Sequence, residues 1–244
     1  MTNTVLLDNI AHQDLRVIVR HGTEFADNIN QVLVFPTEFA ELQREYPIFF
    51  RKDAAGAFQS VALLGFDRDE NLFLDERGWQ ARYIPAIQAR GPFMIGLQDR
   101  EIKGEIRSEP MIQVDLDHPR IANGNGEGEP VFLPHGGNSP YLEHVAAVLR
   151  RIHQGIELSG PMFEAFDAAG LIEPVTVEIK LSETEQFKLQ DYYTIGEERL
   201  AQLDGETLAR LNAAGYLGLA FLAAASLGNV SRLIDMKNAR RGAL

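Results

Sequence analysis

The chain has 244 residues, no cysteine and a formal net charge of −12 at pH 7. Without cysteine it can form neither disulfides nor thiolate metal sites, and its negative charge argues against nucleic acid or anionic lipid as the main partner. The N-terminus shows no signal-peptide pattern, so we expect a folded globular protein of the cytoplasm.

The first 120 residues alternate short apolar runs with turn sequences, which is typical of an antiparallel sheet. A short helix is predicted at 37–46, because Phe39, Leu42 and Tyr46 recur at helical spacing and Pro47 follows. Strands are then expected at residues 48–51, 60–66, 71–74, 79–83, 92–97 and 111–116.

Residues 121–140 are rich in glycine and proline, which predicts a long irregular connection. Loops of this kind are either linkers or functional lids. The apolar residues 131–133 favour a loop that is pinned to the body of the protein.

The C-terminal segment, residues 141–244, indicates helices interrupted by one β-hairpin. Ser139 and Pro140 predict a helix start, and the helix carries an apolar stripe of Leu142, Val145, Leu149, Ile152 and Ile156. A short helix at 161–170, a hairpin of strands 175–181 and 186–193, and short helices beginning near Glu197 and Asp204 follow.

The predicted fold class is therefore α+β, with a mostly antiparallel β-rich N-terminal half and a helical C-terminal half interrupted by a β-hairpin. We expect one domain over 1–244. It would consist of a β-rich region at 1–120, the loop at 121–140 and a helical region with the hairpin at 141–244.

Residues 211–231 carry no charge, and this length suffices to span a bilayer as a helix. However, Gly215 and Gly228 lie where helix ends are expected, alanine contributes little to insertion and asparagine opposes it. We predict two helices joined at Gly228 and Asn229, the first buried and the second capped by Asn229, with no integral membrane segment. Peripheral contact with a membrane stays open.

Two kinds of candidate site are present. The first is a cluster of Asp115, Asp117 and His118 at a strand end, with His135 across the loop, which could hold Fe(II) or Mn(II). The chain lacks the GxSxG and phosphate-loop patterns, and no catalytic residue, metal ligand or cofactor is assigned.

The second candidate is the aromatic and basic segment around Trp79, the only tryptophan. Exposed, its residues would form a platform for a sugar ring or a peptide; the alternative is that Trp79 and Tyr83 are core residues of the sheet. The predicted ligand-binding residues are Trp79, Arg82, Tyr83 and Arg90, facing Asp117, His118, Arg120 and Glu129.

Several stretches together resemble the bacterial SapC family from about residue 30 to residue 236. They are EYPIFF, VALLGFDRDENLFLDERGWQARYIPAIQARGPF, DLDHPRI, GEGEPVF, SPYLEHVAAVLR and AGYLGLAFLAAASLGNVSRLID. The resemblance implies a historical association with surface layers and genes often found beside TonB-dependent receptors, tryptophan-halogenase-like flavoproteins and cupin-like proteins. It implies no catalytic residue.

The expected function is that of a non-enzymatic binding or accessory protein in a bacterial nutrient-uptake or peptide/glycan-processing locus. Its partner would be a protein, a peptide or a glycan, and pairing of the apolar C-terminal helices would give a homo-oligomer. The alternative is a metal-dependent oxygenase or hydrolase that uses Asp115, Asp117, His118 and His135.

Overall fold

The computed structural model describes residues 3–102, 105–122, 126–180 and 186–242. Contacts between Cα atoms group the chain into two compact units. The first unit consists of Met1–Asp27 and Ala86–His153, and the second of Asn28–Pro85 and Gln154–Leu244. This grouping does not test whether the two units form a single domain over 1–244, which stays a prediction.

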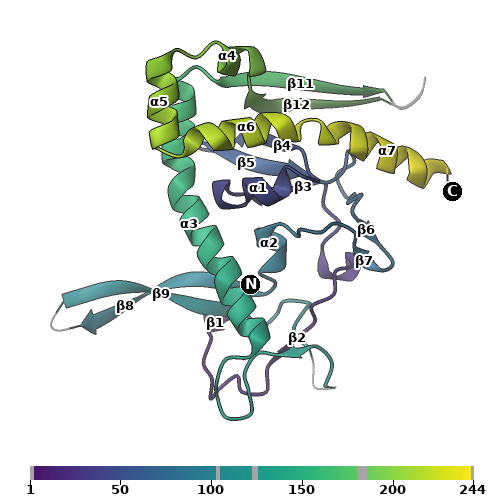
Figure 1. Ribbon diagram of the computed structural model, residues 1–244. Helices are drawn as coiled ribbons and strands as arrows, with labels where there is room; N and C mark the ends of the chain where they lie inside the picture. The colour runs from purple at the N-terminus through teal and green to yellow at the C-terminus, as the bar shows by residue number, and fades with distance from the viewer. Residues whose placement is uncertain (1–2, 103–104, 123–125, 181–185, 243–244) are drawn as a thin grey trace. The chain divides into compact units, whose positions relative to one another are not determined.

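The first unit is built around a three-stranded sheet of order β1-β9-β8 (Figure 1). Its strands are β1 (Thr4–Leu6), β8 (Phe93–Ile102) and β9 (Glu105–Asp115), and all neighbours are antiparallel. A second, two-stranded sheet pairs β2 (Arg16–Val17) with β10 (Glu129–Pro130). The unit also holds the short helices η1 (Thr23–Phe25) and α2 (Ala86–Ala89).

The strands predicted at 92–97 and 111–116 are confirmed, but they belong to one longer hairpin. Its register pairs Phe93 with Val114 and continues to the pair of Ile102 and Glu105. The charged residues between the two predicted segments conceal this extension in the sequence, because apolar alternation marks only strands that face a core.

The second unit contains an antiparallel five-stranded sheet of order β11-β12-β4-β5-β3 (Figure 1). The strands β3 (Gln31–Val34), β4 (Ile48–Lys52) and β5 (Phe58–Leu63) come from the first third of the chain. The C-terminal hairpin of β11 (Ile172–Lys180) and β12 (Gln186–Ile195) joins them through the pairing of Tyr193 with Phe50. The predicted hairpin and the α+β class are confirmed, and the residues between its two strands, 181–185, lie outside the described part of the chain.

The expected strand at 79–83 is wrong over most of its length. Only β7 (Gly78–Trp79) pairs, with β6 (Leu74–Asp75). The helix predicted at 37–46 is also shorter, since α1 spans Phe39–Leu42 after η2 (Pro36–Glu38).

Aromatic side chains form the core of the second unit. Phe50 is fully buried, and its ring lies 5.0 Å from that of Phe163 and 6.4 Å from that of Phe166. Phe49 contacts Tyr192 with a centroid distance of 5.3 Å. Pairs of aromatic rings in these arrangements contribute about 0.5–1.5 kcal/mol beyond the burial of their surface, so this cluster stabilises the sheet.

Helix α3 (Pro140–Ala168) replaces the two helices expected at 140–156 and 161–170. The Ser139 hydroxyl accepts the N–H of Leu142 at 3.1 Å, so the predicted N-cap is confirmed. The predicted stripe is buried except at Ile156, which is 57 % exposed. Pro161 lies inside the helix, contrary to the expected break, and the helix continues although one backbone donor is lost there.

Two short helices, α4 (Glu197–Ala201) and α5 (Gly205–Ala213), follow the hairpin. Asp204 caps α5, since its Oδ1 accepts the N–H of Thr207 at 2.7 Å. The helix start expected near Glu197 is confirmed. The sequence Thr194–Glu197 also predicts a capping box, but Thr194 lies within β12, and its buried hydroxyl has no hydrogen-bond partner in the described part of the chain.

The uncharged stretch covers the end of α5, all of α6 (Tyr216–Ser226) and the start of α7 (Asn229–Gly242), so the predicted division into two helices is confirmed. Residues 216–242 are the one stretch, among those described, whose length and composition would suffice for a membrane span. Helix α6 is buried on one side only, which corrects the expectation of a buried helix: Ala220 and Ala223 are fully buried, whereas Phe221 is 54 % exposed. The buried Ser226 hydroxyl accepts the N–H of Ile48 in β4 at 2.9 Å, which attaches α6 to the sheet.

Polar contacts attach α7 to the same unit. Lys237 Nζ lies 2.6 Å from carboxylate oxygens of both Asp67 and Glu70, and Arg240 donates to the carbonyl groups of Asn71, Leu72 and Leu74. These contacts hold α7 against the second unit, and the absence of an integral membrane segment stays a prediction.

Asn229 does not cap α7, which is a further correction. Its side-chain amide donates to the carbonyl oxygens of Gln43 at 2.8 Å and Tyr46 at 3.2 Å. These carbonyls follow α1, and carbonyl groups at a helix end lack partners within the helix. Asn229 thus joins α7 to the end of α1.

Replacing Asn229 by alanine is expected to destabilise the protein by about 1–2 kcal/mol, because two carbonyl groups lose their donor. The urea midpoint, followed by far-UV circular dichroism, measures this change. Asn238→Ala, at an exposed position of the same helix, is the matched control and should change stability by less than about 0.5 kcal/mol. Equal effects of the two substitutions would contradict the assignment.

Candidate functional site

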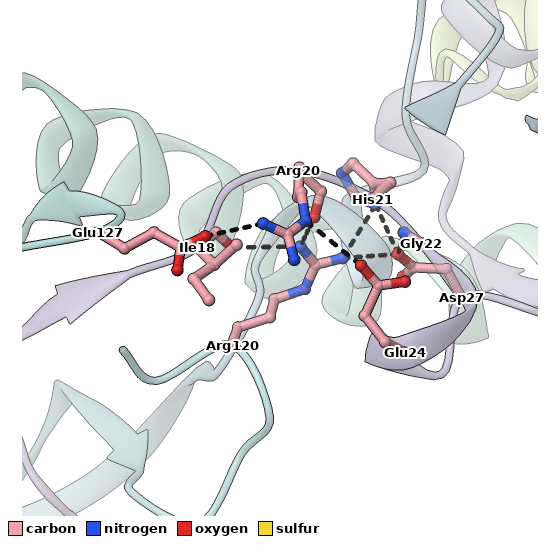
Figure 2. Close-up of polar contacts among 8 residues, drawn as sticks. All are labelled: Ile18, Arg20, His21, Gly22, Glu24, Asp27, Arg120 and Glu127. Atoms are coloured by element: carbon pink, nitrogen blue, oxygen red, sulfur yellow. Dashed lines mark hydrogen bonds and ion pairs between the residues drawn. The ribbon is translucent and has the colours of Figure 1, made fainter. Parts of the chain in front are cut away.

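A buried ion-pair cluster of Arg120, Asp27 and His21 lies in the first unit (Figure 2). We call it the Arg120 cluster. The side chains of Arg120 and Asp27 are only 4 % and 1 % exposed, and Nη2 of Arg120 donates to Oδ2 of Asp27 at 2.7 Å. Nη1 donates to the carbonyl oxygens of Ile18, at 3.2 Å, and of Arg20. A buried charge is tolerated when it is both paired and hydrogen-bonded, as this one is.

Asp27 receives several donors at once. Besides Arg120, the backbone N–H of Gly22 donates to its Oδ2 at 2.9 Å, and Nδ1 of His21 lies 3.1 Å from the same oxygen. Burial alone would raise the pKa of Asp27, but the hydrogen bonds from His21 and Gly22 and the charge of Arg120 bring it below its ordinary value. The carboxylate is therefore ionised at neutral pH and holds the chain reversal at residues 21–27.

Surface contacts surround the Arg120 cluster. Arg20 lies 3.3 Å from the carboxylate of Glu24 and 2.8 Å from that of Glu127 (Figure 2). The guanidinium carbons of Arg120 and Arg20 lie 4.7 and 5.2 Å from the ring centroid of Phe25. The exposed pairs contribute little individually, so the buried pair dominates the energetics.

The glycine-rich connection is fastened to the N-terminal segment, as the apolar residues 131–133 predict. Arg16 donates through Nε and Nη2 to the carbonyl of Gly128, at 3.1 and 2.8 Å, and Val131 is fully buried. Gly128 has φ +84°, and a Cβ there would lie 2.6 Å from the carbonyl oxygen of Val17. Only glycine permits this approach, so the described part of the loop is held in place where β10 meets β2.

A second group of polar side chains gathers around Gly91. A Cβ on Gly91 would lie 3.6 Å from Oη of Tyr141 and 3.8 Å from Cδ of Arg120. Nη1 of the preceding residue, Arg90, donates to the carbonyl of Phe93 at 2.8 Å. His118 belongs to the same region, since the charges of both Arg120 and Arg90 act on its pKa.

The first unit thus brings together three of the predicted ligand residues, Arg90, His118 and Arg120. Asp117 and Glu129 are exposed. The proposed combination of these residues with Trp79, Arg82 and Tyr83 stays a prediction, because the latter three belong to the second unit.

In the second unit, Trp79 and Tyr83 are fixed by hydrogen bonds. The indole N–H of Trp79 donates to Oη of Tyr46 at 2.8 Å, and the Tyr46 hydroxyl donates to the carbonyl of Tyr83 at 2.6 Å. The Tyr83 hydroxyl donates to Glu38 at 2.8 Å. Trp79 and Tyr83 are partly exposed, whereas Arg82 is exposed and its backbone N–H donates to Glu45.

The four residues of the metal alternative do not assemble into a metal site. Among the residues that the structure describes, no group of three or more histidine and acidic side chains could hold an ion. Oδ1 of Asp115 accepts the N–H of Asp117 at 3.1 Å, and Nδ1 of His118 accepts the N–H of Arg120 at 3.1 Å. These two side chains therefore serve the turn that follows β9.

The environment of His118 predicts a pH dependence of stability. Burial lowers its pKa, and the charges of Arg120 and Arg90 act in the same direction while Asp115 opposes them. The unfolded chain binds the proton with a pKa of about 6.5, above that of the folded protein, so the stabilising contribution is present above about pH 6.5 and is lost as the pH falls below it.

Urea midpoints between about pH 7.5 and 5 measure this effect, and His118→Asn is the comparison variant because its amide oxygen can still accept the N–H of Arg120. We expect the wild type to lose more stability over this range than the variant. Parallel curves for the two proteins would show that His118 does not carry the effect.

Sequence reasoning does not find His21, Asp27 and Tyr141. Asp27 lies 93 residues from Arg120 in the sequence, and nothing in its own neighbourhood marks it as buried. Tyr141 has an indirect signal at most: it follows the helix-initiating Ser139 and Pro140, which makes it look like an ordinary first-turn residue.

Comparison with known proteins agrees with the resemblance seen in the sequence. The family model described as SapC matches residues 7–233, nearly the whole chain. No curated protein and no solved structure matched. On the extent of this match, the chain belongs to the SapC family.

Proposed function

We propose that the protein is a non-enzymatic binding protein whose ligand site lies in the first unit, around Gly91. The observation that supports this most directly is the gathering of Arg90, beside Gly91, with His118 and Arg120, which come from the turn that follows β9. Polar side chains that converge on one region from distant segments are the usual foundation of a recognition site.

The contacts in this region suit recognition better than chemical reaction. Arg120 donates to Asp27 and to backbone carbonyls, and His118 accepts a backbone N–H through Nδ1. Side chains fixed in this way hold a set geometry before a ligand arrives, which reduces the entropy lost on binding. The hydrogen bonds described for Arg90, His118 and Arg120 do not pair a nucleophile with a base.

The proposal extends to the cellular role. As a SapC family member the protein would serve as an accessory in a bacterial nutrient-uptake or peptide/glycan-processing locus, in the cytoplasm, with a protein, peptide or glycan as partner. Family membership supports this role only by association. A homo-oligomer formed through the C-terminal helices also stays a prediction, which light scattering at micromolar concentration would test.

Capture of small molecules tests the binding proposal. The purified full chain is immobilised, exposed to a metabolite and peptide extract of the producing cells, washed and eluted, and the eluate is analysed by mass spectrometry. We expect retention of a defined compound, returned with unchanged mass and in at most stoichiometric amount. An Arg90→Met column is the matched control and should retain less of it.

The outcome that would refute the proposal is turnover. If catalytic amounts of the protein deplete a compound and a product of different mass accumulates, the protein is an enzyme. Repeating the incubation with free protein far below the compound concentration separates catalysis from binding.

A further inference from the structure

Arg90 differs from the other buried cations of the protein. Its Nε is buried and, within the described residues, has no hydrogen-bond partner. Its guanidinium donates from Nη1 to the carbonyl of Phe93. By contrast Arg120 is paired with Asp27, and Lys237 with Asp67 and Glu70.

No described carboxylate compensates the charge of Arg90. Burial lowers its pKa, and no acidic residue contributes to that pKa in the opposite direction. In a chain with 35 acidic and 23 basic residues, negative partners are plentiful on average. A partly buried guanidinium without one is therefore unusual, because a buried charge is normally paired.

Two further donors lie in the same region. Tyr141 Oη lies close to Gly91, and burial raises the pKa of Tyr141, so its hydroxyl keeps its proton at neutral pH. His118 accepts at Nδ1, which leaves Nε2 as the N–H donor of its neutral ring. Arg90 and Tyr141 therefore place donors of two chemical kinds beside Gly91, and His118 carries a third in the turn that holds Arg120.

We propose that Arg90 binds an oxyanion of the ligand, a carboxylate or a phosphate, with the Tyr141 hydroxyl as a second donor. This inference rests on the proposed function and names the chemistry of that same site. Guanidinium groups match the planar geometry of carboxylate and phosphate oxygens with two parallel N–H donors, and Nε with one Nη is such a pair. Nη1 is already used by Phe93 and Nε is buried, so the oxyanion would approach through Nη2 and engage Nε as the second donor once it is bound.

Gly91 leaves space beside the Tyr141 hydroxyl because it has no side chain. Its φ of +57° is in the left-handed region, and the residue carries no Cβ beside Tyr141. A side chain there would contact Tyr141 Oη, so glycine leaves room beside this donor.

Titration with simple oxyanions tests the inference on the full chain. The probes are acetate and inorganic phosphate, each compared with chloride at the same ionic strength, and the readouts are chemical-shift changes in ¹H–¹⁵N spectra and the thermal midpoint. Phosphate stabilises many proteins by exclusion from their surfaces, so the quantity of interest is the difference between variants. A response to acetate alone identifies a carboxylate site, and a response to phosphate alone identifies a phosphate site.

We expect Arg90→Met to raise the dissociation constant at least about tenfold and Tyr141→Phe to raise it about three- to tenfold. Arg90→Lys should also weaken binding, since it keeps the charge and loses the paired donors. Arg77→Met, at an arginine of the second unit whose side chain is 80 % exposed, is the matched control and should bind like the wild type.

The stability of Arg90→Met in the absence of a ligand tests the inference independently. If Arg90 is kept for a ligand, Arg90→Met removes an uncompensated buried charge, and the urea midpoint in chloride should equal or exceed that of the wild type. A fall comparable to that of Arg120→Met would assign Arg90 a structural role and overturn the inference. The inference would also be overturned if neither acetate nor phosphate changed the spectra or the thermal midpoint of the wild type more than those of Arg90→Met.

These results are distinguishable from failure of the proposed function. Turnover of a compound would refute the non-enzymatic role even if Arg90 binds its oxyanion. Retention of an unchanged compound that is indifferent to Arg90→Met would keep the binding role and refute the assignment of Arg90.

Discussion

Replacing Arg120 by methionine is expected to destabilise the protein by about 3–5 kcal/mol. The substitution leaves the carboxylate of Asp27, which is 1 % exposed, buried without its guanidinium partner. It also removes the donor to the carbonyls of Ile18 and Arg20. Urea unfolding at neutral pH, followed by far-UV circular dichroism, measures the loss. Fluorescence of Trp79 is less suitable here, because this single tryptophan belongs to the second unit.

Two variants test the reason for this loss. Arg20→Met removes an exposed arginine that makes two surface ion pairs, and we expect a cost of at most about 1 kcal/mol. The double variant Asp27→Asn with Arg120→Met removes both buried charges and should recover some of the stability. If Arg120→Met is as mild as Arg20→Met, the buried pair does not contribute as we describe.

Phe50→Ala is expected to destabilise the protein by about 3–5 kcal/mol as well. Phe50 is fully buried in β4, and its ring packs against those of Phe163 and Phe166 in α3. Truncation leaves a cavity that these rigid rings cannot fill by relaxing. Trp79 is a suitable probe for this variant, because it lies in the same unit.

The matched control removes the same atoms at an exposed position. Phe221 in α6 is 54 % exposed, and we expect Phe221→Ala to cost less than about 1 kcal/mol. A cost near that of Phe50→Ala, or a cost that depends on protein concentration, would mean that the outer face of α6 is covered by another molecule.

Local signals in the sequence are sufficient for features that depend on neighbouring residues. The N-cap at Ser139, the cap at Asp204 and the division of the uncharged stretch into two helices are all present. Each depends on hydrogen bonds or backbone preferences within a few residues, which a single sequence displays directly.

Features that depend on distant partners could not be predicted. Asn229 resembles a helix cap but donates to carbonyls 183 and 186 residues away. Ile156 continues the helical stripe, yet the stripe is buried only as far as packing partners cover it. Pairing of the C-terminal hairpin with β4 likewise depends on non-local contacts that alternation within the hairpin does not reveal.

In the candidate site, too, the residue types can be read from the sequence but their roles depend on distant partners. Residue type alone identifies Arg90, His118 and Arg120 as candidates for ligand contact, because guanidinium and imidazole groups in a turn-rich segment are natural recognition groups. What each one does is decided by its surroundings: Asp27 neutralises Arg120, a backbone N–H engages His118, and Arg90 is left with an unpartnered Nε in the described structure.

The sequence by itself determined the fold class, the family and the principal helices and hairpin, since these depend on local periodicity and on recognisable stretches of residues. Only the tertiary structure decided which charges are neutralised inside the protein and which remain for a ligand. The physical reason is that the free energy of a buried charge depends on partners within a few ångströms in space, whatever their separation along the chain.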